Sequence, residues 1–516
     1  MVSISRRSLL ASLLVLPAVL RGDEEGTSLF NGHSLDGWKA GEHRHSFRVE
    51  DGAIVAAGPR SCLFYSGPVG NANFKNFDLT AEVRTSPGAC SGLHFHTQFQ
   101  SHGPLKTGLK VQINNTGLGG DHDIRKTGSL YSIRNIYKPM VKDDEWFQLR
   151  VQVRDKQAQV WVNGTMIVDY IEPDTPPDAA TPALGHGTFA LECCGGQPKV
   201  SFRNLAVKPL PDDLRTPADL QPQVDDVYRQ LLQLNEQGYP VVDHHTHLKG
   251  GLTLEQALAN SRRLGIMYGI AVNGGLKFPI TNDAGVKDFL ATMQGQPCFV
   301  GLQGEGREWV TLFSRETIAK FDYIFTDCMT FTDDSGFRRR LWIPEEMGDL
   351  SNPEQFMGML VNRIVGILNH EPIDIHANPT FLPDPIAHDY DRLWTPERMQ
   401  KVIDAAKAND VAIEINNRYR LPSPAFIQRA KNSGVKFSFG TNNGDANLGR
   451  DEYSVAMVKQ CGLTPQDLFL PKPDGKKAAQ RHKAGGSVAR LGCKELAGDR
   501  LGYNFGHGNA WMEISG

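Results

Sequence analysis

Between residues 27 and 209 the chain alternates apolar and polar positions in short runs that Gly, Asn, Asp and Pro separate. Alternation with period two is typical of strands with one buried face, and the even spacing of the runs predicts an all-β sandwich of jelly-roll type. Asn163-Gly164, between two of these runs, predicts a two-residue hairpin because both turn positions need a positive φ. The clearest predicted strands are residues 77–83, 92–99, 110–113, 147–153, 157–162 and 188–192.

A second pattern begins at residue 239 and continues to 471, after a linker with a short helical pattern at residues 210–238. Here short apolar runs alternate with helical segments, which predicts a parallel sheet with helices packed outside it. Seven such units favour a TIM-like (β/α)7 barrel over the alternative, an open doubly wound sheet. The predicted strands are residues 240–243, 267–272, 298–303, 323–326, 373–375, 411–415 and 435–439.

The two ends of the chain fit neither pattern. Residues 1–26 contain Arg6-Arg7 followed by an apolar stretch at residues 8–20, which is too short to span a bilayer comfortably and is typical of a signal peptide. The S-R-R-S-L-L order resembles a twin-arginine signal, so we expect an exported, periplasmic or secreted protein; an uncleaved N-terminal anchor is the alternative. Residues 472–516 are basic, Gly-rich and without periodicity, which predicts an unstructured tail.

Composition narrows the possible functions. The 516 residues carry a formal net charge of −3, which argues against a general electrostatic grip on nucleic acid. No apolar run beyond the first twenty residues approaches membrane length, so a polytopic membrane protein is excluded. The eight cysteines are scattered without a C-x-x-C pair for zinc; most are expected to be buried thiols, and a bridge such as Cys62–Cys90 stays open.

The sharpest chemical signal lies at the end of the first barrel strand, in Asp243-His244-His245-Thr246-His247. Strand alternation places Asp243, His245 and His247 on one face, at the barrel mouth, where two imidazoles two residues apart can bind one metal ion. Glu305 and His376 follow other strands and complete a His/Glu/His set typical of Zn, Mn or Fe. The alternative is a hydrogen-bonded histidine cluster.

Several motifs of this region, D-H-H-T-H, G-E, D-I-H, E-I-N-N and F-G-T-N-N-G-D-A-N-L-G, resemble the polymerase and histidinol phosphatase (PHP) family of metal-dependent hydrolases. The resemblance implies that His245, His247, Glu305 and His376 bind one or two divalent ions, Zn or Mn above all. The family's last strand normally ends in D-x-H, where this chain has Asn442-Asn443, with Asp445 as a substitute three residues further on. Asp243, Asn442 and Asp445 complete the candidate ligands, and a barrel that keeps only a structural metal is the alternative.

The sandwich carries its own resemblance. L-F-N-G, G-W, V-E-D-G-A-I-V, S-P-G-A-C-S-G-L-H-F-H, V-Q-I-N-N, G-S-L-Y, D-E-W-F, V-W-V-N-G and F-R-N-L, in this order, are similar to the 3-keto-disaccharide hydrolase family. That family implies chemistry on oxidised sugars, in which a C3 ketone acidifies the C2 proton, a base removes it, and the C1 oxygen leaves. The candidate catalytic residues on the concave face are His94, His96, Gln112, Tyr131 and Glu145.

Two features of the sandwich leave its catalytic role open. His94 and His96 alternate on one predicted strand and are expected to share a face, yet they are equally readable as ordinary polar strand residues. Lys110 stands where members of the family often carry an acid.

Three functions follow from these observations. The first is an exported carbohydrate-active hydrolase that acts on 3-keto-glycosides and has a second, metal-dependent hydrolase domain. The second is a metal-dependent (phospho)hydrolase whose sandwich only binds carbohydrate. The third is a non-catalytic glycan-binding protein. The expected partner in each case is a carbohydrate or an oxidised glycoside, with no nucleic acid and no stable membrane span beyond the signal segment.

Overall fold

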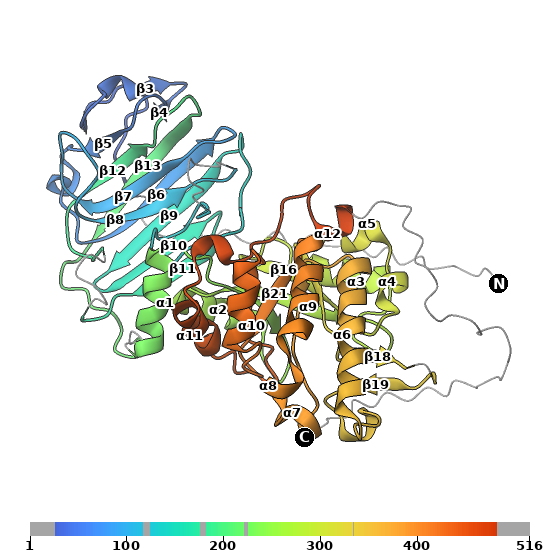
Figure 1. Ribbon diagram of the computed structural model, residues 1–516. Coiled ribbons are helices and arrows are strands. Elements are labelled where there is room, and N and C mark those ends of the chain that lie inside the picture. The colour runs from blue at the N-terminus through green and yellow to red at the C-terminus, as the bar shows by residue number, and fades with distance from the viewer. Residues whose placement is uncertain (1–25, 117–123, 176–181, 221–224, 334, 482–516) are drawn as a thin grey trace, which may run out of the picture. The chain divides into compact units, whose positions relative to one another are not determined.

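The structure is a computed structural model that describes residues 26–116, 124–175, 182–220, 225–333 and 335–481. The chain divides into two compact units, one built mainly from the residues before Tyr239 and the other mainly from those after Gly238. The first unit is a β-sandwich and the second is a parallel barrel surrounded by helices (Figure 1). The fold class predicted from the sequence is therefore confirmed for both.

The sandwich consists of two antiparallel sheets. The larger has eight strands, seven of which run in the order β11-β10-β9-β6-β13-β4-β3, while β1 pairs with β13. Its strands are β1 (Thr27–Ser28), β3 (Phe47–Glu50), β4 (Ala53–Ala56), β6 (Asn76–Thr85), β9 (Phe147–Arg154), β10 (Gln157–Val162), β11 (Thr165–Ile171) and β13 (Val200–Leu210).

The smaller sheet has five strands in the order β2-β5-β12-β7-β8. They are β2 (Trp38–Ala40), β5 (Ser61–Tyr65), β12 (Thr188–Cys193), β7 (Ser91–Thr97) and β8 (Leu109–Ile113). Short 3₁₀ helices, η1 (Arg44–Ser46) and η2 (Val69–Ala72), lie in the connections.

Strand alternation builds the core of the sandwich. Leu93, Phe95 and Leu191 of the smaller sheet join one hydrophobic cluster with Phe77 and Val151 of the larger. The intervening positions of the smaller sheet face the other way, and the candidate site described below lies there. The predicted hairpin is present: Val162 pairs with Thr165, and both turn residues, Asn163 (φ 47°) and Gly164 (φ 78°), have positive φ.

One helix completes this unit. Helix α1 (Asp226–Glu236) begins after Asp225, whose side chain accepts the Tyr228 amide as an N-cap. Tyr228 and Leu232 belong to the same hydrophobic cluster as the sandwich, so α1 packs on it.

The second unit is a closed barrel of seven parallel strands in the order β14-β15-β16-β17-β20-β21-β22. These are β14 (Val242–His247), β15 (Met267–Gly274), β16 (Phe299–Gly304), β17 (Tyr323–Thr326), β20 (Ile375–His376), β21 (Ala412–Asn416) and β22 (Phe437–Gly440). Closure decides between the two predicted arrangements in favour of the barrel. A two-stranded hairpin of β18 (Thr330–Thr332) and β19 (Arg338–Arg340) follows β17.

Helices connect the barrel strands. The reciprocal bonds between Thr253 and Gln256 form a capping box before α2. The helices are α2 (Leu254–Leu264), α3 (Asp283–Thr292), α4 (Trp309–Leu312), α5 (Arg315–Ile318), α6 (Pro353–His370), α7 (Asp384–Ala387), α8 (Tyr390–Leu393), α9 (Pro396–Ala408), α10 (Pro424–Asn432), α11 (Glu452–Gln460) and α12 (Ala478–Arg481), with 3₁₀ helices η3 (Pro344–Glu346) and η4 (Pro465–Asp467).

The described chain ends inside the stretch that the sequence predicts to be an unstructured tail. Helix α12 falls there, and the Ala478 amide donates to the buried Asp374 carboxylate at 3.1 Å, so fixed structure extends to Arg481. The rest of the predicted tail and all of the predicted signal peptide except Gly26 lie outside the described residues. Among the described helices, none combines the length and the apolar character needed to cross a bilayer.

Candidate active site

A pocket of about 200 Å³ opens on the face of the five-stranded sheet that is turned away from the core. Four strands contribute to its floor: Cys62 and Phe64 come from β5, His94 from β7, Lys110 from β8 and Glu192 from β12. The segment between β7 and β8 and the residues around Glu42 form the rim. Every floor residue is thus fixed by sheet register rather than by a loop.

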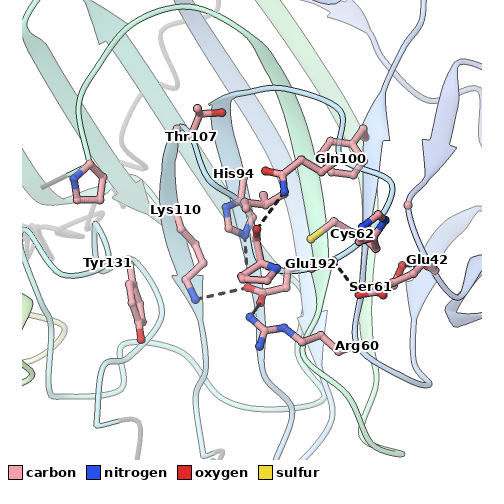
Figure 2. Close-up of a pocket in the computed structure, with 18 residues that line it drawn as sticks. Glu42, Arg60, Ser61, Cys62, His94, Gln100, Thr107, Lys110, Tyr131 and Glu192 are labelled. Carbon is pink, nitrogen blue, oxygen red and sulfur yellow. Dashed lines mark hydrogen bonds and ion pairs between the residues drawn. The ribbon is translucent and has the colours of Figure 1, made fainter. Parts of the chain in front are cut away.

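Glu192 is the centre of the pocket. The residue is 5% exposed, and His94, Lys110 and Arg60 point toward its carboxylate (Figure 2). The Oε2 atom lies 3.4 Å from His94 Nε2 and 3.4 Å from Lys110 Nζ, while Oε1 lies 3.6 Å from an Arg60 guanidinium nitrogen. Strand register brings Glu192, His94 and Lys110 together. Ala190 of β12 pairs with His94 of β7, and His94 pairs with Lys110 of β8.

These neighbours decide the charge of Glu192. Burial raises the pKa of the carboxyl, but the hydrogen bond with His94 and the charges of Lys110 and Arg60 lower it to about 2 in sum. Burial lowers the pKa of Lys110, and the Glu192 carboxylate reverses this effect, so that the pKa lies above its ordinary value. At neutral pH the pocket therefore holds a desolvated carboxylate beside a desolvated ammonium.

Tyr131 completes this wall of the pocket. Lys110 Nζ lies 3.8 Å from the centroid of the Tyr131 ring, and the Arg125 guanidinium lies 4.3 Å from the same ring. Cations over an aromatic face are attracted by the ring quadrupole. Tyr131 thus lines the pocket and contacts the Lys110 ammonium through the face of its ring.

The structure brings together only some of the residues predicted for this site. His94 and Tyr131 line the pocket. Gln112 is fully buried next to it, and its amide donates to Cys90 Sγ at 3.6 Å. Glu145 is exposed, does not line the pocket, and lies 4.0 Å from Lys142 as a surface ion pair.

His96 also lies outside the pocket, and the expectation that it shares a face with His94 is wrong. Its backbone has a φ of 55°, and the register of β7 with β12 shifts between Thr188 and Ala190, so the alternation breaks before His96. The ring packs edge-on against Phe77 of the other sheet, 5.6 Å between centroids.

The hydrogen bonds of His96 show a structural role. Nε2 donates to the Lys75 carbonyl at 2.9 Å, and Nδ1 accepts the Gly185 amide at 3.0 Å. Burial lowers its pKa to about 4. The ring is therefore neutral at physiological pH and has both nitrogens occupied.

The sequence alone did not identify Glu192 or Arg60 as site residues, and it did not predict the ion pair between Lys110 and Glu192. A signal was present in the sequence: Glu192 is the one charged residue in the strand T-F-A-L-E-C, all of whose residues are buried. A buried acid needs a partner. The partners lie 82 and 98 residues away along the chain, so only the fold reveals them.

The barrel holds a second polar cluster. The rings of His245 and His247 lie 5.2 Å apart, as the sequence predicts for neighbours on one face. Glu414 Oε1 lies 2.5 Å from His245 Nδ1, and its other oxygen accepts the Asn378 amide and the Asn416 side chain. His245 Nε2 is buried and has no hydrogen-bond partner among the described residues.

Two buried acids, Glu305 and Asp327, lie near this pair. Burial and the neighbouring Asp327 carboxylate raise the pKa of Glu305 to about 8, and Asn273 donates to it at 2.7 Å. His376 is fully buried, and neither of its ring nitrogens has a hydrogen-bond partner among the described residues.

The other predicted ligands have different tasks. Asp243 is fully buried, and its carboxylate accepts the amides of His245 and Thr441, so it fixes the first strand to the last. Asn442 donates to Asn378 at 3.2 Å, and Asp445 is an exposed loop residue that accepts the Asn447 amide.

The candidate ligand side chains of the barrel are not arranged as a metal site in this structure. His245 has the ring orientation of a ligand, with one nitrogen held by a carboxylate and the other unpartnered. However, among the described residues no group of three or more His, Cys, Asp or Glu side chains is arranged so that it could hold a metal ion. The predicted divalent ion therefore stays a prediction, and no reaction step is derived from it.

Comparisons with known proteins give a family match that falls on the sandwich and several solved structures that are similar to about a third of the chain. Solved structures with a similar fold include two proteins from Parabacteroides distasonis, both described provisionally as glycosyl hydrolases. One is 23% identical and the match covers 36% of this chain and 95% of that protein, with a TM-score of 0.30. The other is 17% identical over 34% and 99% of the two chains, with a TM-score of 0.28.

A carbohydrate-binding module from Bacillus subtilis is also similar, with 12% identity over 33% of this chain and 95% of that module and a TM-score of 0.24. No curated protein matches the chain. A family model does match, and its residues coincide with the two sheets: residues 25–208 match the 3-keto-alpha-glucoside-1,2-lyase-like domain. The N-terminal sandwich therefore carries a domain of the 3-keto-disaccharide hydrolase family.

Proposed function

We propose that the sandwich cleaves 3-keto-glycosides by elimination, with its reaction centre at Glu192. The observation that carries this proposal is a carboxylate held ionised inside a pocket by an imidazole, an ammonium and a guanidinium. Groups of opposite charge fixed at short range are what proton removal next to a ketone requires. The match of residues 25–208 to a lyase-like domain supports the same chemistry.

The first step removes the C2 proton of the sugar. When Glu192 accepts the Nε2 proton of His94, the Nδ1 lone pair of the ring serves as the base. The electrons of the broken C2–H bond pass to the C3 carbonyl and give an enolate. The ammonium of Lys110, held beside Glu192, stabilises the developing negative charge.

The second step expels the substituent at C1. The enolate electrons form the C1–C2 double bond, the C1–O bond breaks, and the hydroxyl of Tyr131 protonates the departing oxygen. Water then adds across the double bond, with its hydroxyl at C1 and a proton at C2. The sum is 3-keto-glycoside plus water giving 3-keto-sugar plus alcohol, with no oxidant or reductant consumed.

An aryl 3-keto-glucoside tests the proposal, because release of the phenol can be followed by absorbance. We expect the full chain to release the phenol and, in D₂O, to incorporate deuterium at C2, which direct displacement at C1 would not do. Glu192→Gln and His94→Ala are expected to lower kcat by about 100-fold or more, as loss of a general base does.

His45→Ala is the matched control, because His45 is an exposed histidine of the same domain that does not line the pocket. It should leave the rate unchanged. Binding of the glycoside without phenol release or deuterium uptake would overturn the proposal and favour a carbohydrate-binding role for the sandwich.

A further inference from the structure

Two cysteines, Cys90 and Cys194, lie just beyond the ends of neighbouring strands in the five-stranded sheet. In the antiparallel pairing of β7 and β12, Leu191 lies opposite Leu93. Continuing this register by three positions brings Cys194 opposite Cys90. The strands stay in contact here, because Ser91 Oγ donates to the Glu192 carbonyl at 2.5 Å.

Both side chains lie on the pocket face. Cys194 follows Glu192 by two positions and Cys90 precedes His94 by four, so alternation places each on the same face as its neighbour. The contact from Gln112 to Cys90 Sγ agrees with this placement. Directly opposed residues of antiparallel strands have Cα atoms about 4.5–5.5 Å apart, within the span of about 4.4–6.8 Å that a disulfide requires.

The two thiols already interact. Their interaction lowers the pKa of Cys90 and raises that of Cys194. Burial adds to the rise for Cys194. Cys90 is therefore the sulfur that ionises first and the better nucleophile of the two.

The other cysteines near the pocket are placed differently. Cys62 pairs with Glu192 from the opposite side of β12, and Cys193 belongs to the hydrophobic core. The pairing that the sequence left open, Cys62 with Cys90, is therefore not the one that the sheet favours. Cys90 and Cys194 are both free thiols in this structure.

We propose that Cys90 and Cys194 form a reversible cross-strand disulfide beside the Glu192 pocket, made by exchange with a small organic disulfide. The Cys90 thiolate attacks one sulfur of that disulfide, and the first small thiol leaves. Cys194 then loses its proton and attacks Cys90 Sγ in the mixed disulfide, which expels the second small thiol. Two electrons and two protons pass from the protein to the small disulfide, which becomes two thiols.

The bond would have a local mechanical effect. It would tie the end of β12, which carries Glu192, to the start of β7, which carries His94. It would also close a long stretch of chain into a ring, which limits the unfolded ensemble. We expect the oxidised protein to unfold at a higher temperature, and to show slower amide exchange at the ends of both strands, than the reduced protein. The proposal does not depend on the activity proposed above.

The test uses the full chain, equilibrated with oxidised or with reduced glutathione, alkylated and digested with trypsin. Cleavage at Lys and Arg places Cys90 alone in residues 85–106, and Cys193 with Cys194 in residues 157–199. We expect a cross-linked pair of these two peptides, lighter by two hydrogen atoms than their sum, in the oxidised sample only. The reduced sample should show both cysteines alkylated.

Matched variants identify the sulfur atoms. Cys90→Ser and Cys194→Ser should each abolish the cross-linked pair, whereas Cys193→Ser and Cys62→Ser should retain it. Near-UV circular dichroism of each variant shows that the fold persists. Full alkylation of Cys90 and Cys194 under oxidised glutathione, or a cross-link that survives Cys194→Ser, would overturn the proposal.

Discussion

The side chain of Glu192 is a buried carboxylate that three neighbouring side chains contact. Its burial would be unfavourable without these partners. Taking a carboxylate out of water costs several kcal/mol, and close partners with fixed geometry offset that cost. His94, Lys110 and Arg60 supply them from two other strands and from the residue that precedes a third. The same contacts that stabilise the fold keep the group in the state that the proposed chemistry uses.

Acid should therefore destabilise the sandwich through Glu192. Its folded pKa of about 2 lies below the ordinary value of 4.5, so the unfolded chain takes up the proton first. The stabilisation is present above pH 4.5 and is lost as the pH falls toward 2, about 3 kcal/mol in all. Hydrogen exchange of β12 in the full chain, followed against pH, measures this loss.

Glu192→Gln should remove this part of the pH dependence while lowering stability at neutral pH, because Lys110 and Arg60 lose their partner. Glu145→Gln makes the same substitution at an exposed acid outside the pocket and should leave the pH profile unchanged. An unaltered profile in Glu192→Gln would mean that other groups control the acid transition.

At the scale of elements, the segment that enters β8 depends on a glycine. Gly108 has a φ of 86°, and a Cβ placed there would lie 2.3 Å from the Phe95 carbonyl oxygen. Gly103, in the same connection, has a φ of 80° and nothing within 4 Å of such a Cβ. The two glycines thus share a backbone conformation and differ only in the space around them.

Alanine at these two positions should therefore have unequal effects. Gly103→Ala is expected to cost about 1 kcal/mol from the left-handed conformation alone. Gly108→Ala should cost about 2–4 kcal/mol, because the collision with the strand backbone adds to that cost, and it should lower activity by moving Lys110. Thermal unfolding of both variants, with the aryl glycoside assay, provides the comparison; equal shifts would contradict the close approach.

Which elements exist could be predicted from the sequence, because period two and strand–helix alternation are local properties. Val162 and Thr165 pair around Asn163-Gly164 as expected, and the seven barrel strands begin within about two residues of the predicted positions. The side chain of His96 could not be placed, because a single positive φ reverses the alternation on which the prediction depended. Glu192 and Lys110 meet through sheet register, which is a long-range property.

At the scale of the molecule, the pocket belongs wholly to the sandwich. All of the residues that line it lie between Gly41 and Glu192. The double variant His245→Ala/His247→Ala should therefore keep the proposed keto-glycoside cleavage within about twofold of the unaltered rate, since neither histidine lines the pocket. Loss of all activity with normal exchange protection of β12 would instead favour a metallohydrolase whose sandwich only binds carbohydrate.

The unaltered chain and the double variant also test whether the barrel binds the predicted divalent ion. Elemental analysis of chain purified without a His tag measures bound Zn, Mn and Fe directly. One or two equivalents that disappear in the double variant would establish metal binding at the barrel, although its side chains would have to move to provide a third donor. Protein that takes up no added metal would leave His245 and Glu414 as a structural pair.

The charged groups of the pocket and much of its rim lie in different segments of the chain. The charged floor is built on strands, whereas much of the rim lies in the connection between β7 and β8, from Gln100 to Gly108. Loops on a rigid scaffold tolerate exchange far better than the strands that carry them. Replacing the segment 100–107 should therefore change which glycoside the proposed reaction accepts, while Glu192 and its partners stay in place.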